Sequence, residues 1–149
     1  MRSFFSKCSN ITSLDFSYFD TSNITDMAFM FNQFHKLKEI KGINKFNTNK
    51  ITNMYGMFQS CKELEYLDLT NFDTSKVTNM YGMFNKCYKL KEIKEINKFN
   101  TNKVTDMETM FQCCYELEYL DLSNVDTSNV TKMNHMFAVC HKLKQINNK

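Results

Sequence analysis

The sequence predicts an α/β fold in which the chain winds as a right-handed solenoid, with one short parallel strand and one short helix in every unit. The first observation is a recurring motif of the form Met-x-x-Met-Phe-x-x-Cys, as at Met54 to Cys61. The second is the spacing of 26 or 27 residues between the motif phenylalanines, which are Phe31, Phe58, Phe84, Phe111 and Phe137. The third is a change of apolar period within each unit, from strand-like to helical. Self-similarity at this period is typical of solenoids, whose units pack only on their neighbours.

The strand of each unit is expected around its leucines. In one unit Leu64, Leu67 and Leu69 are separated by polar residues. This pattern fits a short strand that is approached through an extended turn.

The helix is expected over the methionine and phenylalanine motif that follows. Met80, Met83, Phe84, Cys87 and Leu90 stand at i, i+3, i+4, i+7 and i+10, which is one stripe of an α-helix. These side chains are the expected core of the solenoid.

A threonine stands two residues before the first methionine of each stripe. These residues are Thr25, Thr52, Thr78, Thr105 and Thr131. A threonine in this position can cap a helix by accepting a hydrogen bond from a free N–H group, and Thr105 with Glu108 has the spacing of a capping box. We therefore expect each helix to begin just after its threonine.

Two kinds of unit alternate, which gives a true period of 53 residues. One kind runs from Leu64 to Ser75 and recurs from Leu117 to Ser128. The other runs from Leu37 to Asn49, carries one extra residue, and recurs from Leu90 to Asn102. No linker or change of composition divides residues 1–149, so we expect a single domain of about five and a half units with no obvious capping units.

These motifs resemble the BspA-type leucine-rich repeat family, also described as the mycoplasma-type lipoprotein-associated repeat. The resemblance rests on the run from Leu67 to Met80, on Met83, Phe84 and Cys87, and on the recurrence of the pattern over residues 120–140. It implies a leucine-rich-repeat-like solenoid that serves on a bacterial or parasite surface for adhesion and partner binding. It implies no catalytic activity.

Stacking the units in register places equivalent charged residues in rows. One row reads Thr12, Lys38, Glu65, Lys91, Glu118 and Lys144, and a second reads Asp15, Lys41, Asp68, Lys94 and Asp121. Both rows alternate in sign, and opposite charges on neighbouring strands stabilise a sheet by roughly 0.2–1 kcal/mol per pair. We therefore expect every charge in these rows to have opposite charges above and below it.

A third row gives the candidate partner-binding residues. It contains Glu39, Tyr66, Glu92 and Tyr119, and the lysines of the second row beside it are Lys41 and Lys94. Tyrosine is favoured at recognition surfaces, so Tyr66 and Tyr119 are the first candidates for contact with a protein or glycan ligand. Packing of the two rings against neighbouring Lys and Glu side chains is an equally good explanation.

The charge distribution argues against a nucleic-acid surface. The net charge is only +3, and the two alternating rows cancel locally. Lys45, Lys50, Lys98 and Lys103 do gather in the loops of the second kind of unit. A solvated edge explains them best, and contact with an acidic glycan, a lipid or a nucleic acid is the alternative.

No cofactor, metal or catalytic site is expected. Cys8, Cys61, Cys87, Cys114 and Cys140 share one stripe position, which Phe34 fills in another unit. A slot that accepts either Cys or Phe is apolar, and packed helices would hold these cysteines too far apart for disulfides, so we expect buried, reduced thiols. Cys113 lies off the stripe and is the best candidate for an exposed thiol. No phosphate loop, catalytic motif or zinc-ligand spacing is found.

Two functions follow from this sequence, and neither is enzymatic. The first is a binding or adhesion module, and the alternative is a structural subunit that assembles through uncapped ends at Phe5 and Ile146, or is part of a longer chain. The family resemblance suggests a cell-surface or extracellular location. The start of the chain shows no secretory signal and no stretch approaches a membrane span, so an intracellular location stays open.

Overall fold

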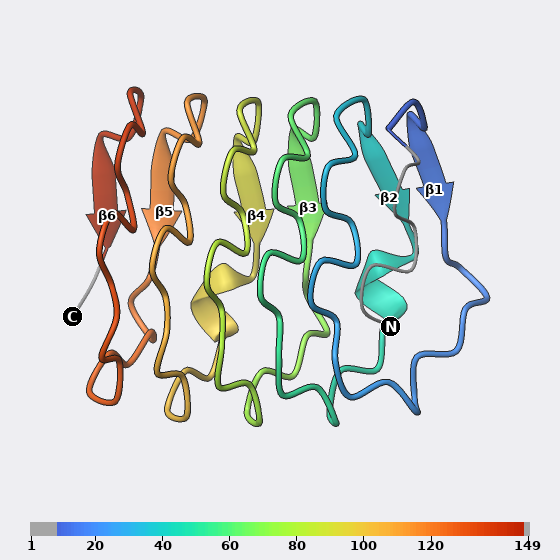
Figure 1. Ribbon diagram of the computed structural model, residues 1–149, viewed down its shortest axis with the longest axis horizontal. Coiled ribbons are helices and arrows are strands. Elements are labelled where there is room, and N and C mark those ends of the chain that lie inside the picture. Colours follow the sequence, from blue (N-terminus) through green and yellow to red (C-terminus); the bar gives the residue numbers. More distant parts are fainter. Residues whose placement is uncertain (1–8, 148–149) are drawn as a thin grey trace.

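The computed structural model describes residues 9–147, which wind as a stack of similar coils (Figure 1). Each coil carries one short strand, and the strands run side by side across the stack. They are β1 (Ser13–Asp15), β2 (Glu39–Lys41), β3 (Tyr66–Asp68), β4 (Glu92–Lys94), β5 (Tyr119–Asp121) and β6 (Gln145–Asn147). Two short 3₁₀ segments, η1 (Ile43–Lys45) and η2 (Ile96–Lys98), follow β2 and β4.

The strands are parallel and their register places equivalent residues beside one another. Tyr66 pairs with Glu92, Leu67 with Ile93, and Asp68 with Lys94. The pairs β1–β2 and β5–β6 have the same register. The rows that the sequence predicts are therefore rows of neighbouring residues in the structure.

The strands stand in three separate pairs rather than in one sheet. Hydrogen-bonded ladders join β1 to β2, β3 to β4 and β5 to β6, but none joins β2 to β3 or β4 to β5. Each interruption follows a unit that carries the extra residue. In one unit the extra residue is Gly42, which has a left-handed φ of 73° and precedes η1. In the other it is Glu95, which has a left-handed φ of 65° and precedes η2. The inserted turn separates the next strand from the one before it.

The expected helix over the methionine motif is wrong, since residues 9–147 contain no α-helix. The backbone instead donates hydrogen bonds from one coil to the next. Gly82 N donates to Glu108 O at 2.9 Å and Phe84 N to Met110 O at 2.9 Å. Gly82 and Lys86 have left-handed φ angles of 54° and 60°. Left-handed residues break a helical run, while the turns between them still point the motif side chains inward.

The threonines ahead of the motif do not act as helix caps. The Thr78 hydroxyl donates to Thr52 O at 3.2 Å, and the Thr105 hydroxyl donates to Thr78 O at 3.3 Å. The side chain of the next residue accepts instead, as where Asp106 Oδ1 accepts from Glu108 N at 3.1 Å. The threonines therefore link neighbouring coils, and in four of the five units the Asp or Asn that follows the threonine orders its own turn.

The core is a set of in-register ladders that run through the stack. Stacked phenylalanine rings lie 5.4–5.7 Å apart between centroids. Their members are Phe31, Phe58, Phe84, Phe111 and Phe137. Inward methionines and leucines flank this ladder, and Met54, Met80, Leu64 and Leu90 are fully buried. The apolar stripe of the sequence is thus the core, although turns rather than helices present it.

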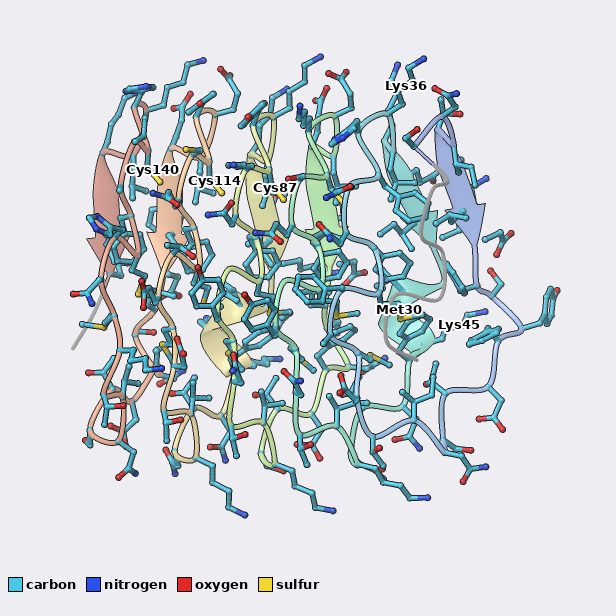
Figure 2. The ribbon with its side chains drawn as sticks, viewed as in Figure 1. Met30, Lys36, Lys45, Cys87, Cys114 and Cys140 are labelled. Atoms are coloured by element: carbon cyan, nitrogen blue, oxygen red, sulfur yellow. The ribbon has the colours of Figure 1, made fainter. Side chains whose placement is uncertain are left out.

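The stripe cysteines form a further ladder, part of which Figure 2 shows in Cys87, Cys114 and Cys140. Cys87 Sγ donates to Phe58 O at 3.1 Å, and Cys114 Sγ donates to Phe84 O at 3.2 Å. Burial raises the pKa of both thiols well above the ordinary value. The cysteines of the described residues are free. The sequence predicted that packed helices would keep these cysteines apart. That reason is wrong, because the cysteines lie on coils that stack at the spacing of neighbouring strands. Phe5 and Cys8 lie outside the described residues.

Candidate binding face and its groove

All six candidate partner-binding residues lie on the outer face of the strands. Tyr66 and Tyr119 open β3 and β5, and their side chains are 45% and 48% exposed. The acidic residues, Glu39 and Glu92, open β2 and β4. The alternate positions of each strand point into the core, as Leu67 does. Successive side chains of a strand point to opposite sides, so the first and third residues of each short strand form this outer face.

The two lysines lie at the other end of the same strands and form ion pairs. Lys41 lies 3.9 Å from Glu39, and Lys94 lies 3.8 Å from Asp68. Both lysines are about half exposed, so these pairs contribute little to stability. The structure therefore places Lys41 and Lys94 at the edge of the face rather than at its centre.

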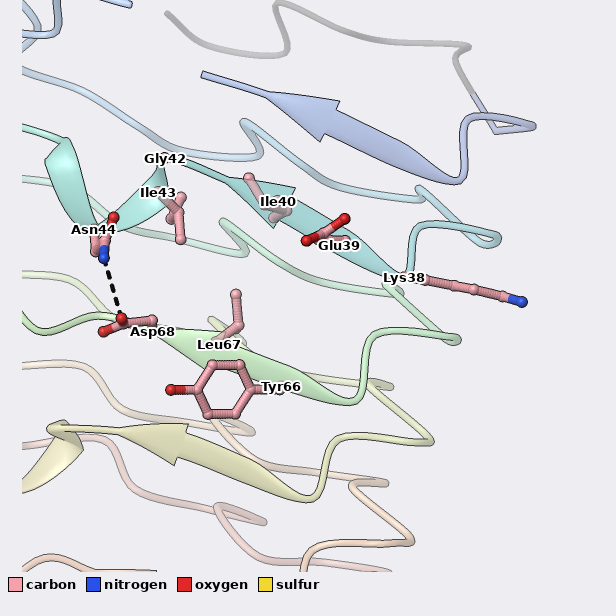
Figure 3. A pocket seen from close by; sticks show the side chains of 9 residues that line it. All are labelled: Lys38, Glu39, Ile40, Gly42, Ile43, Asn44, Tyr66, Leu67 and Asp68. Carbon is pink, nitrogen blue, oxygen red and sulfur yellow. Dashed lines mark hydrogen bonds between the residues drawn. The ribbon is translucent and has the colours of Figure 1, made fainter. Parts of the chain in front are cut away.

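A groove of about 390 Å³ opens on this face between β2 and β3, where the two strands do not pair. Figure 3 shows the residues that line this β2–β3 groove. They are Lys38, Glu39, Ile40, Gly42, Ile43, Asn44, Tyr66, Leu67 and Asp68. Two candidate residues, Glu39 and Tyr66, come together here from adjacent coils.

One end of the β2–β3 groove is closed by a hydrogen bond between the two coils. Asn44 Nδ2 donates to Asp68 Oδ2 at 3.1 Å (Figure 3). The hydroxyl and N–H of Thr70 also donate to Asp68, and together with Asn44 and Lys94 they lower the pKa of the Asp68 carboxyl. Asp68 is thus held as a carboxylate with its lone pairs occupied, which makes it a structural wall of the groove.

The same arrangement recurs one period further along the chain. Asn97 Nδ2 donates to Asp121 Oδ2 at 2.9 Å across the gap between β4 and β5. Tyr119 stands there in the place of Tyr66. Its hydroxyl accepts a hydrogen bond from Asn147 Nδ2 at 2.8 Å, whereas Tyr66 Oη has no such protein partner among the described residues. Tyr66 is the better placed of the two to contact a ligand.

The alternating charges are paired on one side only. Lys91 Nζ lies 2.6 Å from Glu65, and Lys144 Nζ lies 3.2 Å from Glu118. The hydrogen bond from Lys91 lowers the pKa of the Glu65 carboxyl. Within residues 9–147 no ion pair joins Lys38 to Glu65 or Lys91 to Glu118. Direct ion pairs in this row therefore form within the strand pairs, and across the gap Lys38 still lowers the pKa of the Glu65 carboxyl through its charge.

Sequence reasoning missed the residues that the coil junctions add to the face. Asn44 and Asn97 follow the inserted turn, and their spacing of 53 residues is the signal that could have identified them. It also missed a half-buried aromatic column beside the strand face. Tyr88 stacks on Tyr115 at 4.8 Å between centroids, and Lys62 Nζ lies 5.5 Å from the Tyr88 ring.

The described residues show no arrangement for metal binding, because no three His, Cys, Asp or Glu side chains gather closely enough to hold an ion. None of the helical segments within residues 9–147 is long and apolar enough to cross a membrane.

A model of one protein family matches this chain twice, over residues 1–94 and 62–149, which together span its whole length. The family is described as Mycoplasma protein of unknown function, DUF285. A comparison with curated proteins found no match.

Among solved structures, a leucine-rich cell surface protein from Faecalibacterium prausnitzii A2-165 has the same fold. It matches with a TM-score of 0.66 and 20% sequence identity. The match covers 99% of this chain and 35% of that protein, so the chain spans about a third of the length of its structural relative. The suspected kinship with BspA-type leucine-rich repeat surface proteins is confirmed, and the chain belongs to the DUF285 family.

Proposed function

We propose that this chain is a surface-protein repeat module that binds a protein or glycan ligand through its strand face and catalyses no reaction. The observation that carries the proposal is the half-exposed ring of Tyr66 at the β2–β3 groove, beside Glu39 and Lys38. Aromatic rings that remain exposed beside a groove are favoured points of recognition. The structural relative is a leucine-rich cell surface protein, which supports a surface location for this chain.

The repetition of the site supports a ligand that is extended along the stack. Tyr66 and Tyr119 occupy equivalent places two coils apart, each with an Asn–Asp hydrogen bond beside it. Two weak contacts on one ligand reinforce each other when the spacing fits. We infer that the 53-residue period serves to repeat this site, because it places one tyrosine and one gap between strands in every two units.

Alanine substitution of the two tyrosines tests this proposal. We expect the double variant Tyr66→Ala/Tyr119→Ala to lose at least about tenfold in affinity, since buried aromatic contacts dominate most interfaces. The measurement is binding of the purified chain to arrays of glycans and of purified extracellular matrix proteins, followed by titration of the best ligand.

The matched control is Tyr18→Ala, because Tyr18 is 99% exposed and lies outside the strand face. It should bind as the wild type does. Unchanged affinity in the double variant, with an unchanged circular dichroism spectrum, would rule out the strand face as the binding surface.

A second candidate function is assembly through the end of the stack. Met133 is 49% exposed, whereas Met54, Met80 and Met107 in the equivalent positions of earlier coils are buried. Beside it a groove of about 460 Å³ is lined by Leu122, Val125, Thr127, Met133, Met136, Phe137 and Ile146. This last described coil presents core positions to solvent, and a further coil from a second copy would cover them.

If copies stack in this way, the mass in solution should rise with protein concentration. Ile146→Asp is expected to abolish that rise, because a carboxylate on the covered face would be desolvated without a partner. Sedimentation equilibrium over a wide concentration range measures it, with Tyr66→Ala as a control that still associates. A wild-type chain that stays at 17.7 kDa throughout excludes the stacked assembly.

A further inference from the structure

One charged column of the stack departs from the alternation seen elsewhere. Lys50, Lys76 and Lys103 stand at equivalent positions in three consecutive coils, between threonines that are in register. The rows on the strand side put a carboxylate between successive lysines. This lysine column instead places residues of like charge on neighbouring coils, whose backbones lie about 4.8 Å apart. Neighbouring like charges destabilise a stack, so the column calls for another explanation than stability.

The three lysines are exposed and have no ion-pair partner among the described residues. Other lysines of the loops are engaged: Lys98 lies 2.5 Å from Glu95, and Lys45 lies over the Tyr18 ring at 6.0 Å. From the sequence we expected Lys45, Lys50, Lys98 and Lys103 to gather in the loops. In the structure Lys50 and Lys103 instead lie in a column with Lys76, and Lys45 and Lys98 lie outside it.

The backbone beneath the column is fixed on both sides. The buried hydroxyl of Thr48 donates to Asp73 O at 3.0 Å, and that of Thr74 donates to Asn100 O at 3.0 Å. The residue after each lysine is fully buried, as Ile51 and Val77 are. The ammonium groups therefore project from rigid anchor points at a regular spacing.

Two carboxylates approach the column and do not neutralise it. Asp20 and Asp73 each lie three residues before a position of the column. Their Oδ1 atoms accept from Ser22 N at 2.8 Å and from Ser75 N at 2.9 Å. Serine hydrogen bonds lower the pKa of both carboxyls more than Lys50 or Lys76 does. The carboxylates are turned toward their own loops.

We propose that the lysine column binds a linear acidic polysaccharide that carries one carboxylate on each sugar. An extended polyuronate chain carries its negative charges at regular intervals along a line, as the column carries its positive charges, and the flexible lysine side chains can turn toward the carboxylates that face the column. The exposed hydroxyls of Thr52, Thr78 and Thr105 form a parallel column two residues away, which provides neutral partners for sugar hydroxyls.

A nucleic acid fits the column less well. Duplex DNA presents a charge about every 1.7 Å of its axis along a helical path, which a straight row of three lysines cannot follow. The net charge of +3 and the pI of about 8.5 are also below the strong basic bias of most nucleic-acid-binding domains. The lysine column is distinct from the strand face, so its ligand does not depend on Tyr66 or Tyr119.

The test compares two variants that remove the same charge. The column variant is Lys50→Gln/Lys76→Gln/Lys103→Gln, and the control variant is Lys89→Gln/Lys91→Gln/Lys142→Gln. Each variant lowers the net charge by three, from +3 to zero. The control lysines are paired with Glu63, Glu65 and Glu116. The probe is a size-defined oligogalacturonate, titrated calorimetrically at low salt, with neutral dextran and duplex DNA as comparison ligands.

We expect the column variant to bind the oligogalacturonate roughly a hundredfold more weakly, since each lysine near an anionic surface contributes about fivefold. The control variant should stay within about threefold of the wild type, and Tyr66→Ala/Tyr119→Ala should bind fully. Equal losses in the two triple variants would reduce the effect to net charge and overturn the proposal. Wild-type binding that is absent, or that favours DNA, would overturn it too.

A single substitution separates binding from folding. Lys76→Glu creates the order Lys–Glu–Lys within the column but places a second carboxylate near Asp73, so we expect little net change in melting temperature while oligogalacturonate binding is abolished. A Lys76→Glu variant that still binds would show that the column is not the site.

Discussion

Replacing Phe84 with alanine is expected to lower the free energy of unfolding by about 3–5 kcal/mol. The Phe84 ring is fully buried at the middle of the stack, between the rings of Phe58 at 5.7 Å and Phe111 at 5.4 Å. Its loss leaves a cavity that the flanking coils cannot fill, because their backbones are joined by hydrogen bonds on both sides of it. Chemical denaturation followed by circular dichroism measures the change.

Phe137→Ala is the matched control, since it removes the same side chain from the same ladder. Phe137 is half-buried and stacks on Phe111 at 5.6 Å, with no ring beyond it among the described residues. We expect Phe137→Ala to lower the free energy of unfolding by about 1–2 kcal/mol, because the Phe137 side chain buries less apolar area than Phe84 does. Equal costs at the two positions would show that the ladder is not a continuous core. Native-state hydrogen exchange adds a second readout, because loss of Phe84 should open the central coils first.

The repeat and its register could be predicted because they depend on spacing alone. Residues 26 or 27 apart are neighbours in any stack of equal coils, whatever their local conformation. The rows through Tyr66 and Glu92, and through Asp68 and Lys94, therefore appear in the structure as the sequence predicts them. The apolar stripe through Met80 and Phe84 is buried for the same reason.

The local conformation of the stripe could not be predicted from its apolar spacing. Successive tight turns bring i, i+3 and i+4 to one side just as a helix does. The backbone decides between them, and in these coils its N–H groups bond to the next coil instead of to their own turn. Gly56 and Gly82 inside the presumed helices were the available signal, since glycine is unfavourable in a helix by about 1 kcal/mol relative to alanine.

The β2–β3 groove could not be predicted because it depends on the conformation of the inserted residue. The extra residue was visible in the sequence, but its left-handed φ and the 3₁₀ turn after it are what separate the strands. The gap leaves Lys38 and Glu65 without a direct ion pair and creates the groove beside Tyr66. One inserted residue in every second unit therefore changes both the electrostatics of the face and its shape.

Gly42→Ala should be the most damaging small substitution in the loops, with a cost of about 3 kcal/mol. The φ of Gly42 is +73°, a conformation that costs an L-residue roughly 1–2 kcal/mol. An added Cβ would also lie 2.6 Å from Ser17 N and 2.7 Å from Ser17 Cα, and these backbone atoms of the preceding coil cannot rotate away. Overpacking of this kind adds about 1–3 kcal/mol. Thermal and urea unfolding measure the sum.

Gly82→Ala separates the two contributions. Gly82 has a similar φ of +54°, but a Cβ there would make only ordinary contacts, at 3.5 Å from Asn85 Cβ and Thr109 Oγ1. Thr109 itself occupies the equivalent position of the next coil with a φ of 56°. We expect a cost near 1 kcal/mol, from the backbone conformation alone. Equal costs at the two glycines would show that the close approach of Gly42 to the Ser17 backbone does not restrict the inserted turn.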